Sequence, residues 1–261
     1  MSSDRYRVHR QRGHQDSGYR RWGVWGRGIF GCAALVEIGV ALWVATAIWQ
    51  AHASTPTPTN LPLAQLLALM EYHDQIQREG LKHYKAVRHY SVEYQGLGSI
   101  KASMEVEVEF DATTGKSFRI LSQSGSKIFG EKVLKRAMDS EKEAWQDGGA
   151  TAMTQANYRF QLLGSESVNG RPAYILNVEP LTQSKFLYRG KIWVDATDFA
   201  VVKVDATPAK NPSFLISRTT IRYTNAKTGD FWLPQQSRSE TKVRIGGTAV
   251  LSIDYGTYEI R

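Results

Sequence analysis

The pattern of apolar and polar positions divides the chain into a short N-terminal part and a long part rich in strand signals. Gly28–Trp49 is a run of 22 residues in which Glu37 is the sole charged residue. A helix over this run is about 33 Å long at 1.5 Å per residue, enough to cross the hydrocarbon core of a bilayer. We therefore expect one transmembrane helix at 28–49, preceded by an arm at 1–27 and followed by a Pro/Thr-rich linker at 50–62.

Helical spacing of apolar residues occurs twice after the linker. In Leu63–Gln77 apolar residues recur three and four positions apart, which predicts an amphipathic helix. We expect Asn60 to cap this helix, with Pro62 in its first turn and Gly80 at its end. A second helix is expected over Lys127–Gln146, with apolar residues on one face and Lys and Glu on the other.

Alternating positions predict strands through most of the remaining sequence. Met104–Phe110 alternates over seven residues between an apolar face and a wholly acidic face, which is typical of a strand with one side in water. Thr113-Thr114-Gly115 is expected to turn this strand into a partner, and Asn169-Gly170 is a strong hairpin signal. Further strands are expected at Tyr90–Tyr94, around Phe118–Ile120, and at Tyr158–Val168, Arg171–Val178, Phe186–Asp195, Phe199–Asp205, Phe214–Asn225, Phe231–Ile245 and Thr248–Ile260.

These elements amount to about ten strands, with one helix before them and a second helix inserted after the third strand. Consecutive hairpins without long crossovers form an antiparallel meander. The fold class is therefore mainly β with two helices (α+β), in which residues 63–261 form a domain built on a curved antiparallel sheet. The two helices are the available cover for its apolar face.

The inward-facing strand residues exceed what two short helices readily cover, so we expect part of the concave face to be a cavity. A closed core filled with aromatic side chains would leave the same alternation, and the sequence alone does not separate the two. The candidate cavity residues, which lie on the first strands and the second helix, are Met104, Val106, Val108, Phe110, Phe118, Ile120, Phe129 and Val133.

Charge indicates how the N-terminal part is oriented. Residues 1–27 contain seven Arg against two Asp, whereas no charge follows the apolar run until Glu71. Positive charge stays on the cytoplasmic side, so we expect the N-terminus in the cytoplasm and residues from about 50 onward to be exported. Ala51-His52-Ala53 before Ser54 also fits a signal-peptide cleavage site, and cleavage with release into the periplasm stays open as the alternative.

Several classes of chemistry have no candidate residues in this sequence. The one cysteine, Cys32, lies inside the apolar run, and no histidine follows His89. The histidines match no metal-binding spacing, and Asp195 and Asp198 fit a turn better than a catalytic pair. From Ser54 to the end there are 26 basic and 22 acidic residues without a basic run, which argues against nucleic acid. We therefore expect no catalytic residue, metal or cofactor.

Three stretches of the C-terminal half resemble a known family. They are Tyr188–Asp195 with Phe199–Val204, then Phe231–Pro234, and Ile253–Tyr258. Over about residues 61–261 the chain resembles the periplasmic outer-membrane lipoprotein-sorting superfamily (LolA/LolB-like), to which related sigma-factor regulators belong.

The resemblance implies an open half-barrel with a helical lid and a hydrophobic interior that receives acyl chains. It also implies an arginine that holds the lid near the sheet, for which Arg119 is the nearest position in this sequence. The chain departs from the family because it has neither a clear cleavable signal nor a lipid-attachment cysteine after its apolar run.

The sequence thus favours a non-enzymatic carrier-type protein of the bacterial envelope that binds lipid or lipoprotein acyl chains and contacts the inner membrane through residues 28–49. The alternative function is a membrane-anchored envelope-stress sensor or interaction module of the same fold, with an envelope protein as partner. Its sequence feature is the intact apolar run with a 27-residue arm.

Overall fold

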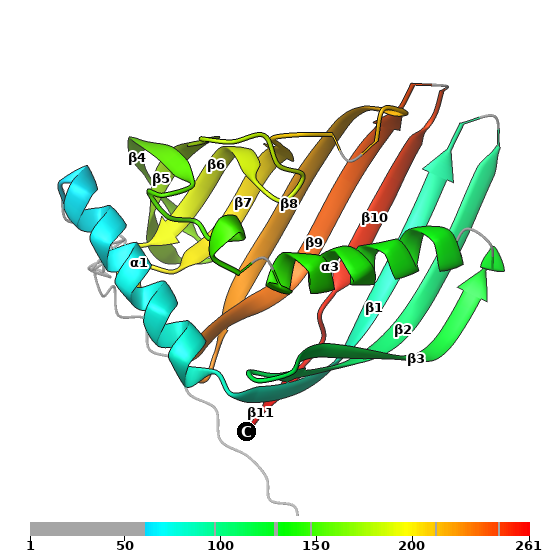
Figure 1. Ribbon diagram of the computed structural model, residues 1–261, viewed down its shortest axis with the longest axis horizontal. Helices are drawn as coiled ribbons and strands as arrows, with labels where there is room; N and C mark the ends of the chain where they lie inside the picture. Colours follow the sequence, from blue (N-terminus) through cyan, green and yellow to red (C-terminus); the bar gives the residue numbers. More distant parts are fainter. Residues whose placement is uncertain (1–60, 97, 128–129, 147, 212, 245) are drawn as a thin grey trace, which may run out of the picture. The chain divides into compact units, whose positions relative to one another are not determined.

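The computed structural model describes residues 61–261, except 97, 128–129, 147, 212 and 245, and these belong to one compact unit (Figure 1). The arm at 1–27, the apolar run at 28–49 and nearly all of the linker at 50–62 lie outside the described residues. Within the described part of the chain, no helix has both the length and the apolar character that a membrane crossing requires.

The domain is built on one open, curved antiparallel sheet of eleven strands (Figure 1). Neighbours follow the order β3-β2-β1-β10-β9-β8-β7-β6-β5-β4, and β11 pairs with β1 beside β10. Edge strands β3 and β4 end this path, so the sheet is not closed. The strands are β1 (His83–Gln95), β2 (Ser99–Asp111), β3 (Gly115–Gly125), β4 (Tyr158–Val168), β5 (Arg171–Pro180), β6 (Tyr188–Asp195), β7 (Val201–Pro208), β8 (Ile216–Thr228), β9 (Phe231–Val243), β10 (Thr248–Asp254) and β11 (Tyr258–Ile260).

The meander expected from the sequence is confirmed, although β6, β7 and β8 each begin two residues later than expected and two larger differences occur. β1 begins at His83 rather than near Tyr90, because the inward positions of its first half include a charged residue, Arg88, which interrupts the apolar pattern. The expected last strand is divided into β10 and β11 at Gly256, where φ is +61° and a Cβ would lie 2.1 Å from the Val87 carbonyl oxygen.

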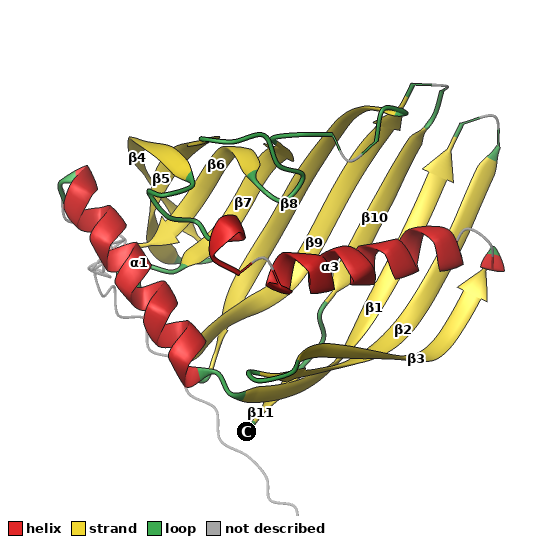
Figure 2. Ribbon diagram, in the orientation of Figure 1, coloured by secondary structure: helices red, strands yellow, loops and turns green. Residues whose placement is uncertain are grey.

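The two expected helices are present, and they end at Gly80 and Gln146 as expected (Figure 2). Helix α1 (Leu63–Gly80) begins after Pro62 and has no side-chain cap; the Pro62 carbonyl instead accepts bonds from Gln65 and Leu66. Asn60, the expected cap, lies outside the described residues. The second helix starts with a π-helical turn, η1 (Gly130–Leu134), and continues as α3 (Lys135–Gln146), before a short 3-10 turn, η2 (Gly148–Thr151).

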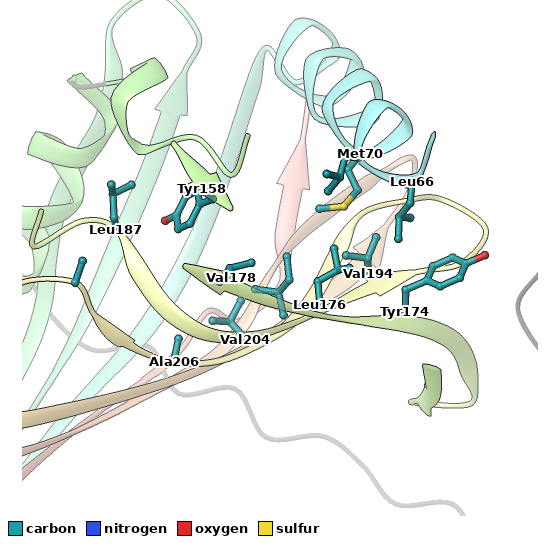
Figure 3. Close-up of a cluster of buried hydrophobic side chains, with 13 residues drawn as sticks. Leu66, Met70, Tyr158, Tyr174, Leu176, Val178, Leu187, Val194, Val204 and Ala206 are labelled. Carbon is teal, nitrogen blue, oxygen red and sulfur yellow. The ribbon is translucent and has the colours of Figure 1, made fainter. Parts of the chain in front are cut away.

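Each helix covers its own hydrophobic core. Leu66, Leu67 and Met70 of α1 pack against inward residues of β4–β7, including Leu176 and Val194 (Figure 3). Leu134 and Met138, from η1 and α3, pack against residues of β1 and β2.

Both cores lie on the same face of the sheet. Register partners form a continuous row across six strands, so their side chains point to one side. The row is Val204, Tyr223, Ser237, Ile253, Tyr90 and Met104.

Candidate functional site

A mainly apolar hollow lies where the C-terminal ends of α1 and α3 approach the sheet. It measures about 460 Å³, within the roughly 300–1,000 Å³ of small-molecule sites. Four aromatic residues line it: Tyr84 of β1, Phe110 of β2, Trp145 of α3 and Trp232 of β9, whose side chain also packs against Trp193 and Val202. The other lining residues are Asp74, Gln77, Arg78, Leu81, Ala112, Lys116, Leu233 and Pro234. We call this hollow the aromatic pocket.

Helix α1 is fixed at one side of the aromatic pocket by a single side chain. Gln77 Oε1 accepts a hydrogen bond from the Trp232 N–H at 2.8 Å, and Gln77 Nε2 donates to the Trp232 carbonyl at 3.5 Å. The amide thus bonds to β9 much as a neighbouring strand would. A smaller hollow of about 230 Å³, lined by His73 and Asn225 among others, adjoins it beyond Gln77 and Trp232.

At the other side, Trp145 covers the start of β3. A Cβ on Gly115 would lie 2.9 Å from the Trp145 ring, and Gly115 has φ of +86°. Glycine therefore meets two demands here, a left-handed backbone and close approach of an indole. This contact holds the last turn of α3 against the sheet.

A buried ion pair joins α3 to the sheet next to the aromatic pocket. Arg88 of β1, which is fully buried, donates from Nη1 to both Glu141 oxygens at 2.9 and 3.1 Å. Lys116 Nζ of β3 lies 2.5 Å from Glu141 Oε1. Lys116 and Tyr84, whose hydroxyl accepts from Arg88 Nη2 at 3.3 Å, also line the pocket. We call Arg88, Lys116 and Glu141 the latch.

The charges of the latch stabilise one another, so Arg88 and Glu141 stay ionised. Burial by itself would raise the pKa of Glu141, but Lys116 and Arg88 outweigh it and lower that pKa. Burial likewise disfavours the charge of Arg88, and the Glu141 carboxylate overcomes this and raises the pKa of the guanidinium. Two cations thus share one carboxylate, which leaves the trio with a net positive charge.

Tyrosines surround the latch. The Arg88 guanidinium carbon lies 4.6 Å from the centre of the Tyr255 ring, a cation–π distance. Burial raises the pKa of Tyr90, Tyr255 and Tyr258. These phenols therefore stay neutral and provide rings and hydroxyls to the buried cation.

Most of the residues expected to line an acyl cavity are packed instead. Met104, Val106 and Val108 are almost completely buried against Leu134 and Met138, so the concave face is filled there. The expectation of a cavity at these positions is wrong, because Leu134 of η1 and Met138 of α3 pack against them. Phe118 and Val133 pack against the same cluster as partly buried residues.

The remaining candidates are separated. Phe110 stacks on Tyr84 with ring centres 5.1 Å apart and lines the aromatic pocket. Ile120 lies on edge strand β3 and is 41% exposed. Phe129 lies outside the described residues. Of the expected set, Phe110 is the one that the structure places in the pocket wall.

Arg119, the nearest position for the expected lid arginine, bonds to a neighbouring strand rather than to a helix. Arg119 has a 68% exposed side chain and bonds to Glu107 on the other face of the sheet, together with Lys85. Arg88 is the arginine that bonds a covering helix. A sequence signal existed, since Arg88 lies two residues from Tyr90 and four from Tyr84 and so shares their inward face.

The turn chemistry expected at Asp195 and Asp198 is confirmed. Asp195 Oδ1 accepts from the backbone N–H groups of Thr197 and Asp198, and Arg171 bonds to both Asp195 oxygens. Asp198 accepts from Lys227 and from Trp232 Nε1. These carboxylates stabilise the β6–β7 turn. The described residues contain no group of three or more His, Cys, Asp or Glu side chains arranged to hold a metal ion.

No protein-family model matches the chain, and no curated protein matches it. Similar solved structures include an outer membrane lipoprotein-sorting protein domain from Vibrio parahaemolyticus, at 12% identity, 75% coverage of this chain, 92% of that chain and TM-score 0.39. A LolA superfamily protein from Nitrosomonas europaea matches at 13% identity, 77% and 94% coverage and TM-score 0.34. A Pseudomonas aeruginosa MucA/MucB complex matches at 9% identity, 74% and 99% coverage and TM-score 0.25. Two of these names belong to the superfamily that the sequence resembles.

Proposed function

We propose that this chain is a non-enzymatic binding protein of the bacterial envelope that holds an acyl chain of a lipid or lipoprotein in the aromatic pocket. The observation that carries the proposal is the pocket wall, in which four aromatic residues and two leucines line a hollow of about 460 Å³. Each buried methylene contributes about 0.8 kcal/mol. An acyl chain therefore binds such a wall without a cofactor.

The composition of the wall supports binding rather than catalysis. Among the described residues that line the aromatic pocket there is no Ser, Cys or His to act as nucleophile or base. Its ionisable side chains are engaged: Asp74 pairs with Arg78 at 2.9 Å, and Lys116 pairs with Glu141. These groups maintain the pocket.

For location we propose that residues 28–49 anchor the chain in the inner membrane with the N-terminus in the cytoplasm and the domain in the periplasm. The charge asymmetry of residues 1–27 supports this orientation. Membrane protein from cells is expected to retain Gly28–Trp49 after a carbonate wash. If Edman sequencing of the mature protein starts at Ser54, residues 1–53 are a cleaved signal and not an anchor.

The second candidate function is an anchored stress sensor or interaction module. The observation that favours it is edge strand β3, which pairs with β2 on one side and exposes Ile120 and Leu121 by 41% and 43%. An extended segment of an envelope protein can add to such an edge by β-augmentation.

Tryptophan quenching by brominated fatty acids tests the first function. Residues 54–261 contain three tryptophans: Trp145 and Trp232 in the pocket wall, and Trp193 on the opposite face of the sheet, where Lys203 lies over its ring. Trp193→Phe leaves only the two pocket emitters. The double variant Trp145→Phe/Trp232→Phe leaves only Trp193.

We expect a saturable loss of emission from Trp193→Phe when brominated palmitate is added, and little loss from the double variant. Ala112→Phe is designed to fill the pocket without adding a tryptophan emitter. Ala68→Phe, on the exposed side of α1, is its matched control. Ala112→Phe is expected to abolish quenching in the Trp193→Phe background. Equal quenching of both emitter sets would reject the pocket as the binding site.

A further inference from the structure

A second surface lies along one end of the strands, away from the aromatic pocket. Because neighbouring strands are antiparallel, β1, β3, β5, β7 and β9 all run toward the same edge of the sheet; the turns after β1 and β9 lie at the top of Figure 1. The connections that follow these strands form what we call the loop rim, whose described residues are 96, 98, 126–127, 181–187, 209–211, 213–215, 244 and 246–247.

Backbone hydrogen bonds hold neighbouring parts of the loop rim together. The Lys210 N–H donates to the Ser184 carbonyl at 3.2 Å, which joins the β5–β6 and β7–β8 loops. The Arg244 N–H donates to the Leu215 carbonyl at 2.8 Å, which joins the β9–β10 turn to the same loop. Tyr94 Oη bonds to the Gly246 carbonyl at 3.1 Å and adds the end of β1.

The loop rim exposes large apolar side chains. Phe214 is 83% exposed, the highest value among the exposed large hydrophobic residues described, and its neighbour Leu215 is 41% exposed. Leu181, at the start of the β5–β6 loop, is 46% exposed. Leaving such side chains in water is costly and marks a surface that meets an apolar phase.

The charge of the loop rim is of one sign. Its five segments contain Lys127, Lys185, Lys210 and Arg244 and no Asp or Glu. Lys185 pairs with Glu143 of α3, whereas no ion pair is formed by Lys210 or Arg244 among the described residues.

Two further cations lie on the strand ends next to the loop rim. Arg218 of β8 and Lys242 of β9 are direct register partners, and both are exposed. Like charges in opposite positions destabilise a sheet. The nearest acid along β9 is Glu240, two residues before Lys242, and a pairing between them is not among the salt bridges of the described chain.

The turns at the other end of the strands differ in charge. Asp111 precedes the β2–β3 turn, Asp198 lies in the β6–β7 turn and Asp230 in the β8–β9 turn. The domain therefore has a cationic, apolar end and an end that carries carboxylates.

We infer that the loop rim docks on an anionic lipid surface, with Phe214 and Leu215 entering the interface and Lys210, Arg218, Lys242 and Arg244 contacting the headgroups. Cations attract the domain to anionic lipid, and the exposed aromatic and leucine side chains gain by leaving water. This combination fits a bilayer better than an acidic protein, which would satisfy the cations but leave Phe214 without an apolar phase. The acyl-binding pocket plays no part in the inference.

A local probe tests this contact in the full chain. Cys32→Ser with Gln183→Cys gives one thiol on the exposed β5–β6 loop, to be labelled with the environment-sensitive dye NBD. Asp230→Cys in the same background labels the opposite end. Vesicles contain phosphatidylcholine alone or with one part in three of phosphatidylglycerol. Because each dye reports its own surroundings, attachment through another segment does not reproduce the signal.

We expect a blue shift and quenching by nitroxide-labelled lipid at position 183 with the anionic vesicles, and neither at position 230. Each cation near the surface favours docking about fivefold, so Arg218→Gln/Lys242→Gln should lower the ratio of docked to undocked loop rims, read from the dye at position 183, about 25-fold. Phe214→Ser should remove the blue shift, and circular dichroism confirms that the variants are folded.

Equal responses at positions 183 and 230, or a response that Phe214→Ser leaves unchanged, would overturn the inference. A polyglutamate chain that shifts the dye as strongly as the anionic vesicles would assign the surface to an acidic polypeptide and would also overturn it. If brominated palmitate does not quench the tryptophans of the aromatic pocket, the proposed function is contradicted, but the docking of the loop rim on lipid is not.

Discussion

Arg88 Nη1 and Glu141 Oε2 lie 2.9 Å apart, although 53 residues separate them in the chain. The pair joins an inward position of β1 to the middle of α3, the helix that packs against β1 and β2. Because Arg88 is fully buried, its charge depends on the carboxylate that the helix brings to it. The position of α3, and with it one wall of the aromatic pocket, is therefore tied to this contact.

Removing the carboxylate of the latch should destabilise the domain in a pH-dependent way. Glu141→Gln leaves Arg88 without its buried partner, which costs about 3 kcal/mol in free energy of unfolding near pH 7. Since the folded pKa of Glu141 lies below the unfolded value of 4.5, its contribution is complete above about pH 4.5 and is lost as pH falls through the folded pKa. Urea titrations at several pH values should show the gap between wild type and variant closing in acid.

The matched control for the latch is Glu143→Gln on the same helix. Glu143 pairs with Lys185 in an exposed bridge, so its loss should cost less than about 1 kcal/mol. A Glu141→Gln variant as stable as this control at pH 7 would show that the latch does not hold α3.

A charge at Val108 should unfold the domain. Val108 is fully buried in the cluster under η1 and α3. We expect Val108→Glu to lose about 4 kcal/mol or more. Loss of the melting transition, measured by circular dichroism, checks this. Retention of the wild-type melting temperature would mean that a cavity exists under α3 after all.

Gly115 should tolerate substitution less well than another glycine with the same backbone angle. Gly115 and Gly170 have φ of +86° and +79°, but only Gly115 has the Trp145 ring 2.9 Å from a new Cβ. Strain at positive φ costs both alanine variants about 1 kcal/mol. Overpacking adds about 1–3 kcal/mol to Gly115→Ala alone.

The difference between these two variants isolates the Trp145 contact. In a Trp145→Ala background the extra loss at Gly115 should disappear, as chemical denaturation of all four variants can show. Equal costs for Gly115→Ala and Gly170→Ala in the wild-type background would place Trp145 away from β3.

Residues 54–261 are expected to fold without the N-terminal part. Both cores are formed within residues 61–261, and the fragment contains no cysteine. A single cooperative melting transition and a monodisperse sedimentation profile without detergent are the expected results. Aggregation of the fragment, under conditions where the full chain is monodisperse in detergent, would contradict this boundary.

The alternation of Met104–Phe110 and the Asn169-Gly170 turn determined the strands and their antiparallel order, because side-chain period and turn geometry are local properties. The sequence also determined which face of β2 is inward. It did not determine whether that face borders a cavity or a packed helix, since both leave the same alternation. Only the tertiary structure decided that η1 and α3 fill the face at Val106 and Val108 and leave a hollow at Phe110. The same holds for Arg88: its place in the β1 alternation is readable, but its partner Glu141 is not, because a contact between a strand and a helix 53 residues later depends on how the helix lies across the sheet.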